Sequence, residues 1–410
     1  MPNRNRQRAV VGLAAGLAGA ALVGAYAANR RHVYRAAGSP PLIDWTRVRR
    51  VAVQMNPEPA PVAAWHASWA AYYAELVHRC EPLIAAEMGR SLPQPVQDIA
   101  AFTRAEWVDA NIRNFQILFE PIEDMHRRGF RVDDLVEVLL SDGNKLVVSA
   151  ELGILLAYLA RRVLGQYDLS LLGREPVTGA GRLYFVEPNI GGVQQELGLD
   201  PDEFRLWIAL HETTHAFEFE AYSWLRPYFN DLIERYFASV LEDLVGLRGG
   251  RSGLANIVGR ARQNLAQGDT WIEAVMTGEQ RDLFDRLQAL MAVVEGYSNY
   301  IMNTVGGRLL PSYETIKQQF EARAARRSPA EKLFIRLTGL ALKMEQYRLG
   351  EEFINAVVAR AGVHTANRIW DGPEQLPTLA ELRDPAAWLA RLDRGAPGPP
   401  PGTTRVTTPL

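Results

Sequence analysis

The chain has 410 residues, of which 48% are hydrophobic and 22% charged, and its formal net charge is −2. This composition is that of a globular protein, and the near-neutral balance excludes the basic field by which a protein binds nucleic acid. The single cysteine, Cys80, excludes an intrachain disulfide framework and any zinc cluster built on cysteines.

An uncharged run, Ala9–Ala28, lies near the N-terminus between two groups of arginines. A run of about 20 residues can just span a bilayer, so residues 1–36 are predicted to be a membrane anchor with a single span. Two alternatives are a secretory signal cleaved near Ala25–Ala27, and a soluble helix or disordered leader. Arginines continue after the run, which favours a cytoplasmic body over an exported one. A soluble cytoplasmic protein is the remaining alternative.

The body of the chain is predicted to be mainly helical, because apolar residues recur at helical spacing in most of it. The helical segments are Val62–Cys80, a segment opened by a capping box at Thr103 and Glu106, Leu146–Leu164, Leu232–Leu244, Leu283–Met302 and Ala330–Ala359. Leu183–Val186 is typical of a short strand that ends at Pro188. These segments predict an α+β fold, mainly α with a small β-sheet.

No convincing linker interrupts the body, so we expect one domain over residues 41–394, with two lobes as an open alternative. Residues 395–410 are rich in Pro, Gly and Thr and are predicted to be a disordered tail.

The segment from Asp200 onward predicts a buried helix. Asp200 can cap it, Pro201 suits its first position, and Glu203 completes a capping box. Apolar residues then occupy nearly every face, which is typical of a helix inside a core.

This helix contains the sequence His211-Glu212-Thr213-Thr214-His215. On a helix, His211 and His215 lie on one face a turn apart, where two imidazoles can hold one metal ion. Glu212 is then placed to take a proton from a water that the metal activates. Burying such polar groups costs free energy unless they are bonded, which favours a metal site.

A catalytic zinc ion needs three protein ligands and an open position. The extended pattern H-E-x-x-H-x-x-G-x-x-H is excluded, since positions 218 and 221 are Glu218 and Ala221. The candidates for a third ligand are the glutamates Glu218, Glu220, Glu234, Glu242, Glu273, Glu279 and Glu295. We expect Glu295, because it ends the apolar run Leu290–Val294, where a carboxylate is rarely buried without a partner. The alternative is that Glu295 pairs with an arginine or lies on a solvated face.

Two further residues are expected to support the ligands. Glu218 lies on the face of the histidines, one turn further along the helix. Asn299 lies one turn after Glu295 and could accept a hydrogen bond from the second N–H of a ligand imidazole.

The site predicts a zinc-dependent hydrolase that cleaves peptide or amide bonds, with one Zn²⁺ per chain and a peptide or protein as its substrate. Glu212 is the expected general base, and Tyr297 and Tyr300 are candidate donors to the oxyanion. The predicted strand Leu183–Val186 could bind an extended peptide by strand addition, or could simply belong to the core.

A competing prediction is a di-iron carboxylate oxidoreductase. Such sites use two Glu-x-x-His motifs. This chain offers Glu212 with His215, and Glu123 with His126. This alternative leaves His211 without a role.

Several stretches together resemble the type 2 zincin-like metallopeptidases, from about Asp44 to Leu392. They are Arg104–Val108, Tyr184–Asn189, Trp207–His215, Ser223–Arg226, Glu295–Tyr297, Ile369–Trp370, Leu376–Leu379 and Pro385–Trp388. The resemblance implies a zincin fold with a gluzincin-like site, in which His211 and His215 are ligands, Glu212 is the base and Glu295 matches the family's downstream glutamate. Some members carry a label that links them to coenzyme F420 biosynthesis, which implies no F420 site.

The chain departs from the family at two positions. Tyr297 stands where members often have a histidine, and Asn299 where they often have an aspartate. These departures motivate a further alternative: an inactive, membrane-anchored scaffold that binds metal without catalysing a reaction.

Overall fold

The computed structural model describes residues 43–127, 142–168, 181–246, 276–326 and 340–395. They divide into two compact units, each described here by itself. The first unit draws on Met1–Pro57, Val108–Ala160 and Val240–Val275. The second draws on Glu58–Trp107, Arg161–Ser239 and Met276–Leu410.

The first unit is helical where it is described. Helix α2 (Trp45–Gln54) packs on α6 (Asp142–Ala160), and Gly153 permits the close approach, since a Cβ atom there would lie 2.7 Å from the Cβ of Val51. Asp44 caps α2 by accepting from the N–H of Arg47, while its own N–H donates to the Ser149 hydroxyl. The part of α4 (Arg104–Arg127) from Val108 onward also belongs to this unit.

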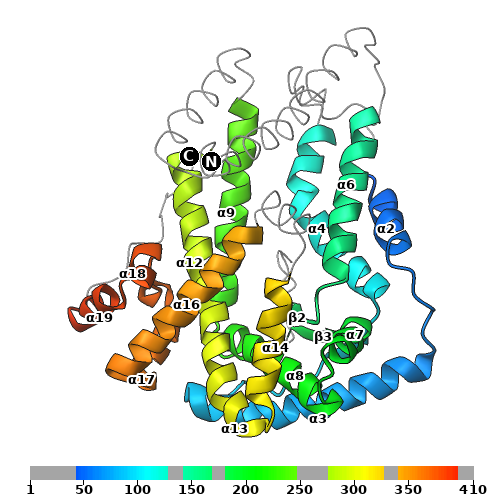
Figure 1. The fold of residues 1–410 in the computed structure, drawn as a ribbon. Coiled ribbons are helices and arrows are strands. Elements are labelled where there is room, and N and C mark those ends of the chain that lie inside the picture. Colours follow the sequence, from blue (N-terminus) through cyan, green and yellow to red (C-terminus); the bar gives the residue numbers. More distant parts are fainter. Residues whose placement is uncertain (1–42, 128–141, 169–180, 247–275, 327–339, 396–410) are drawn as a thin grey trace, which may run out of the picture. The chain divides into compact units, whose positions relative to one another are not determined.

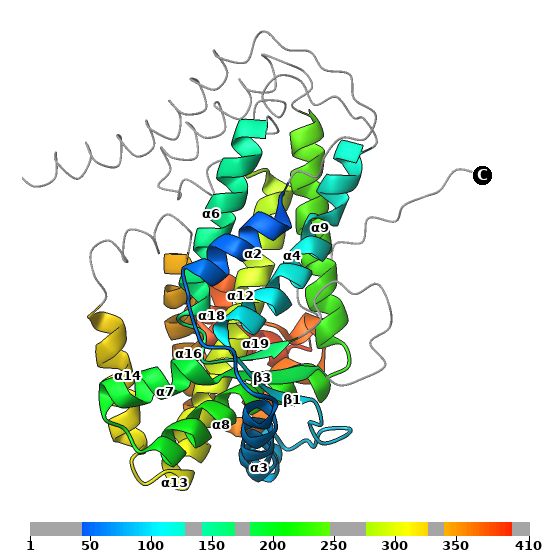
Figure 2. The same cartoon turned by 90° about the vertical axis from the view of Figure 1, so that its right-hand side faces the viewer.

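The second unit contains a small sheet with the strand order β1-β3-β2 (Figures 1 and 2). The central strand β3 (Arg182–Val186) pairs in parallel with β1 (Ile99–Phe102) and antiparallel with β2 (Gly165–Asp168). With its many helices this sheet confirms the α+β class. Because β3 has a neighbour on each side, no peptide can add to it, and the predicted strand addition at Leu183–Val186 is wrong.

The helices of the second unit share one apolar core with this sheet. They are α3 (Ala63–Met88), α7 (Glu187–Leu197), α8 (Pro201–Glu220), α9 (Leu225–Gly246) up to Ser239, α12 (Gly278–Ile301), α13 (Gly307–Leu309), α14 (Tyr313–Ala325), α16 (Leu340–Ala361), α17 (Val363–Asn367), α18 (Leu379–Arg383) and α19 (Pro385–Asp393). A five-residue π-helix, η2 (Met302–Gly306), continues α12, and short 3₁₀ turns lie at Arg368–Asp371 and Pro373–Gln375. Helices α12 and α16 lie side by side (Figure 1).

Local rules account for most of these boundaries. The capping box predicted before α4 is confirmed, since the N–H of Thr103 donates to Glu106 and the N–H of Glu106 donates to the Thr103 hydroxyl. The short strand predicted at Leu183–Val186 is confirmed, and it ends before Pro188. Helix α7 begins directly after it at Glu187, and Pro188 occupies the first turn of the helix, where a missing N–H costs nothing.

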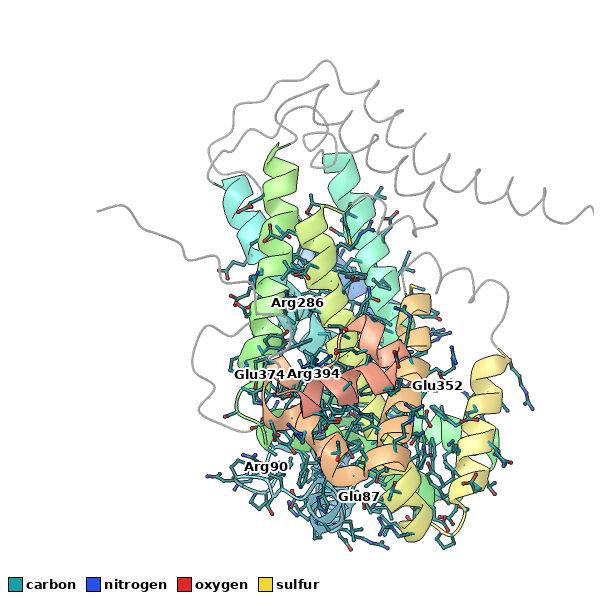
Figure 3. All side chains as sticks on the ribbon, turned by 90° about the vertical axis from the view of Figure 1, so that its left-hand side faces the viewer. Glu87, Arg90, Arg286, Glu352, Glu374 and Arg394 are labelled. Atoms are coloured by element: carbon teal, nitrogen blue, oxygen red, sulfur yellow. The ribbon has the colours of Figure 1, made fainter. Side chains whose placement is uncertain are left out.

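Helix α3 is tied to the end of α12 through Glu87, which is labelled in Figure 3. Its carboxylate accepts hydrogen bonds from the Tyr300 hydroxyl at 2.7 Å and from Arg308 at 2.8 Å. The carbonyl of Met88 accepts from the Asn367 amide at 3.0 Å. These contacts connect segments that lie far apart in the sequence.

The helices of the structure contradict the expected membrane span. In the part of the chain that the structure describes, no helix combines the length and the apolarity needed to cross a membrane. The run Ala9–Ala28 lies outside the described residues, as do His126's side chain and the tail from residue 396 onward.

Candidate metal centre

Helix α8 carries the two histidines, and its sequence explains its position. Asp200 Oδ1 accepts from the N–H groups of Asp202 and Glu203, at 3.0 and 2.9 Å, as predicted for an N-cap. The Glu203 carboxylate, expected to close a capping box, accepts instead from the backbone and hydroxyl of Ser312. The helix is buried over most of its length against α3, α12 and the sheet.

The two threonines inside the motif are buried and satisfied within the helix. Thr213 donates to the carbonyl of Ala209 at 2.6 Å, and Thr214 donates to that of Leu210 at 2.8 Å. Their hydroxyls therefore need no partner in the site, which leaves the histidines and the glutamate as the residues of the motif that can act there.

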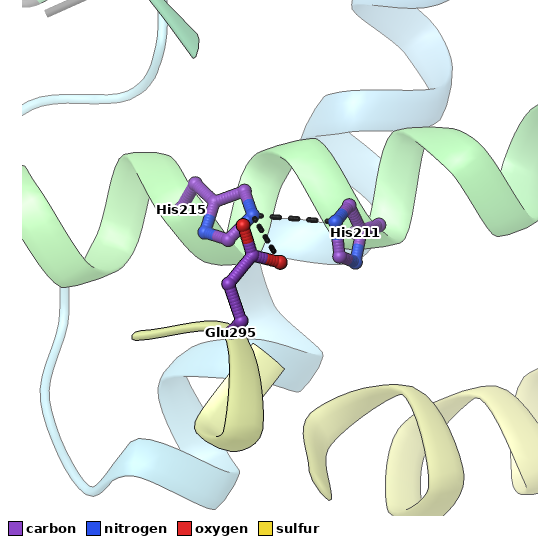
Figure 4. A group of neighbouring side chains, drawn as sticks. All are labelled: His211, His215 and Glu295. Atoms are coloured by element: carbon purple, nitrogen blue, oxygen red, sulfur yellow. Dashed lines mark hydrogen bonds and ion pairs between the residues drawn. The ribbon is translucent and has the colours of Figure 1, made fainter. Parts of the chain in front are cut away.

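Three side chains from two helices converge on one point (Figure 4). His211 Nε2 and His215 Nε2 lie 3.2 Å apart, and His215 Nε2 lies 3.9 Å from Glu295 Oε2. One ligand atom from each of the three residues lies within 4.8 Å of the others, and in the described residues this is the one such group of three. The structure thus brings together the three residues that the sequence selected.

The distances and the chemistry fit a metal ion. Two nitrogen ligands about 2.05 Å from a tetrahedral zinc ion lie roughly 3.3 Å apart, close to the spacing of the two Nε2 atoms. In each ring the other nitrogen, Nδ1, is engaged by an oxygen. His215 Nδ1 lies 2.8 Å from Glu218 Oε2, and His211 Nδ1 lies 3.1 Å from the Ser298 hydroxyl. An imidazole that donates through Nδ1 presents the lone pair of Nε2, so both lone pairs point at the same space.

Glu218 is fully buried, and its second oxygen has no hydrogen-bond partner among the described residues. Burial raises the pKa of this carboxyl well above its usual value of 4.5, and the negative charge of Glu295 raises it further. A divalent cation held by His215 would oppose both effects, because it favours the ionised carboxylate.

Glu212 lies on the same turn of α8 but faces the sheet. It is 7% exposed. A Cβ atom on Gly165 of β2 would lie 2.6 Å from its Cγ and 2.9 Å from its Oε1. The absence of a side chain at Gly165 therefore makes room for the carboxylate expected to act as base.

Asn299 does not make the contact that was predicted for it. Its amide donates to Glu351 Oε2 at 3.3 Å, and the hydroxyl beside His211 belongs to Ser298. The reason is helical phase: Ser298 is three residues after Glu295, and the rotation of α12 turns this residue, and not the next, toward α8.

Neither tyrosine proposed as an oxyanion donor is available. The hydroxyl of Tyr297 donates to Asn367 at 2.6 Å and that of Tyr300 to Glu87 at 2.7 Å. Both side chains are buried in the apolar core.

A cavity of about 370 Å³ lies beside the three converging residues. His211, Glu212 and Glu295 form part of its wall. The other lining residues are Leu164, Gly165, Trp207, Ile208, Asn299, Met302, Asn303, Tyr313, Lys317, Phe320, Glu321 and Glu351. Asn303, Tyr313 and Lys317 could not be predicted from the sequence, because their proximity depends on how α12, η2 and α14 pack together.

The alternative di-iron site needs the side chain of His126, which lies outside the described residues. The carboxylate of Glu123 accepts a hydrogen bond from the N–H of Ile43 at 3.3 Å. Among the described residues, the carboxylate grouped with His211 and His215 is that of Glu295.

Comparison with known proteins agrees with this description. A family model described as zincin-like metallopeptidase matches residues 43–389. The crystal structure of a proposed hydrolase with a novel fold, from Chloroflexus aurantiacus, is 43% identical to the chain. The match covers 86% of this chain and 99% of that one, with a TM-score of 0.63. No curated protein matches the chain.

Proposed function

We propose, from the premise that this chain belongs to the zincin-like metallopeptidase family, that it is a zinc-dependent peptidase. The family and the relative from Chloroflexus aurantiacus support a hydrolase. In our proposal His211, His215 and Glu295 hold one zinc ion, Glu212 is the general base, and the substrate is a peptide or a protein.

The observation that carries the proposal is that the potential metal ligands and the expected general base lie beside the same cavity. Three potential ligands have atoms within 4.8 Å of one another, and the carboxylate of Glu212 lines the same cavity. Glu212 is 7% exposed and lies against Gly165 of β2, so its carboxylate is held at the cavity next to the potential ligands.

The chain's own residues would divide the chemistry as follows. Zinc bound here would supply Lewis acidity, which acidifies water and polarises a carbonyl. Glu212 would accept the proton of the attacking water and deliver it to the leaving amine. Glu218 and Ser298 would hold the imidazole rings of His215 and His211 with their Nε2 atoms directed at the metal.

The substrate backbone has a suitable partner in β2. This strand pairs with β3 on one side, and Gly165 at its start lies both on the cavity and against Glu212. An extended peptide that paired with β2 would lie about 4.8 Å from this strand, next to the residue that contacts Glu212. We therefore assign to β2 the role first expected of β3.

The test combines metal analysis with hydrolysis. Purified protein should contain one zinc per chain and cleave members of a peptide library in a chelator-sensitive way. Glu212→Gln should retain zinc and lose about 10²- to 10⁴-fold in kcat. Glu279 is an exposed carboxylate in the first turn of α12, so Glu279→Gln is the matched control and should keep full activity.

Two other outcomes would reject the proposal. Two irons per chain would favour an oxidoreductase. One zinc per chain with no chelator-sensitive cleavage of any peptide would favour a metal-binding scaffold without activity.

A further inference from the structure

The cavity beside the metal centre contains an ammonium group that the proposed chemistry does not use. Among the described residues that line it, Lys317 of α14 is the one lysine or arginine. Its Nζ donates to Asn303 Oδ1 at 2.8 Å. Lys317 is partly exposed, so a molecule in the cavity can reach it.

Asn303 is held so that its carbonyl oxygen faces Lys317. Its amide nitrogen donates to Glu351 Oε1 at 3.1 Å, and its Oδ1 accepts from Lys317 and from the Tyr313 hydroxyl, at 2.8 and 2.6 Å. Asn299 donates to the other oxygen of Glu351 at 3.3 Å. Both oxygens of Glu351 are thus engaged by amides.

Asn303 lies in the π-helix η2, directly after the helix that carries Glu295. A π-helix is uncommon and frequently occurs at functional sites. Here it places a neutral acceptor, and not a carboxylate, against the ammonium of Lys317.

The ammonium keeps two donors for another partner. An ammonium has three N–H groups, and Asn303 occupies one. No contact with a carboxylate is found for Lys317 within the part of the chain that the structure describes. Glu321 lies one turn further along α14 and is exposed, so its charge is solvated.

We infer that Lys317 is a specificity residue that binds a carboxylate of the substrate, an inference that rests on the proposed peptidase function. A carboxylate would accept the free N–H groups in a charge-assisted pair inside a partly enclosed cavity. Two sources offer this group: the C-terminus of a peptide, and the side chain of an aspartate or glutamate.

The ammonium and two of the potential metal ligands, His211 and Glu295, line the same cavity. Asn303, which accepts from Lys317, is eight positions after Glu295, roughly 12 Å along a regular helix. An extended peptide covers that length in about three to four residues, so the carboxylate is expected a few residues from the bond that is cut.

The experiment measures cleavage by the zinc-loaded protein and binding to zinc-loaded Glu212→Gln, which needs no turnover. Its probes are N-acetylated alanine peptides. One arm compares a free C-terminus with its amide. The other compares a single Glu with Gln, moved along an amidated peptide. In at least one of the two comparisons, the peptide with the carboxylate should bind about ten times more tightly than its uncharged counterpart.

Variants at position 317 decide whether this preference depends on the ammonium. Lys317→Met should abolish it, Lys317→Arg should keep most of it, and Lys317→Glu should prefer a peptide with Lys over one with Glu. Arg323→Met on the same helix, which removes a surface ion pair with Glu196, should leave it unchanged.

The outcomes separate the two proposals. Equal binding of carboxylate and uncharged peptides, or a preference that survives in Lys317→Met, would overturn the role of Lys317. Chelator-sensitive cleavage in the same protein would still support the peptidase function. A preference that depends on Lys317 without any cleavage would support the carboxylate site and reject the peptidase.

Discussion

Gly296 of α12 and Gly350 of α16 lie in direct backbone contact. A Cβ atom on Gly296 would lie 2.2 Å from the carbonyl carbon of Gly350, and one on Gly350 would lie 1.8 Å from the carbonyl oxygen of Ala292. Glu295 precedes the first glycine and Glu351 follows the second, and both glutamates line the cavity. The helix crossing therefore positions a proposed metal ligand together with the residue that orients Asn303.

Gly350→Ala should separate these helices, because the clashing atom is backbone and cannot rotate away. We expect the variant to lose about 3 kcal/mol of unfolding free energy and to bind zinc more weakly. Urea denaturation and a competitive zinc titration measure the two effects. Gly192→Ala in α7, where a Cβ atom would meet nothing within 4 Å, is the control and should gain up to about 1 kcal/mol. A Gly350→Ala variant as stable as wild type would show that the crossing is not tight.

Gly165→Ala should displace the general base Glu212 without changing zinc binding. The added methyl would overlap the Glu212 side chain and displace its carboxylate. We expect kcat/KM to fall about 10²-fold with zinc still at one per chain, since small misplacements of a reacting group have effects of this size. Gly278→Ala, at an open position, should change neither quantity. Loss of zinc from Gly165→Ala would contradict this assignment.

Ser298 and Asn299 form a direct comparison on adjacent positions of α12. Ser298→Ala removes the oxygen beside His211 Nδ1 and should weaken zinc binding about tenfold. Asn299→Ala removes a contact with Glu351 and should change zinc affinity by less than about threefold. Competition with a chromogenic chelator measures both affinities, and the reverse order would restore Asn299 as the supporting residue.

Glu218 predicts how the metal-free protein responds to pH. Its pKa is raised by burial and by Glu295, so the folded state binds a proton that the unfolded state releases as pH rises above about 4.5. Stability from this group is therefore complete below that pH and falls as pH rises toward the elevated pKa. Glu218→Gln, which cannot ionise, should flatten this decline.

Zinc should reverse the pH effect of Glu218. Binding should release a proton from its carboxyl, and zinc affinity should rise with pH. Calorimetry in buffers of different ionisation enthalpy counts the protons released. Glu218→Gln should release about one proton fewer than wild type when zinc binds. Release of the same number of protons by both proteins would show that Glu218 is already ionised without metal.

The local parts of the site were predictable from the sequence. The cap at Asp200 and the spacing of His211 and His215 are properties of one helix, and Glu295 was selected by the cost of burying a carboxylate in an apolar run. The choice between Ser298 and Asn299 was not predictable, because it depends on how α12 is rotated against α8.

The sheet was only partly predictable for a similar reason. Strand β3 has the apolar sequence of a buried strand, whereas β1 and β2 have four residues each and no clear alternation. Both are strands because they pair with β3, and pairing is a property of the folded chain. Gly165, Asn303 and Lys317 acquire their roles through such contacts.

The distance in sequence between the proposed ligands has a consequence for the stability of the protein. His215 and Glu295 are separated by 80 positions, so a zinc ion held by both would be a reversible cross-link that closes a long loop between α8 and α12. A cross-link of this kind stabilises mainly by restricting the unfolded chain. Cys80, alone in the sequence, can form no intrachain disulfide to do the same. The thermal stability of the second unit should therefore follow the concentration of free zinc.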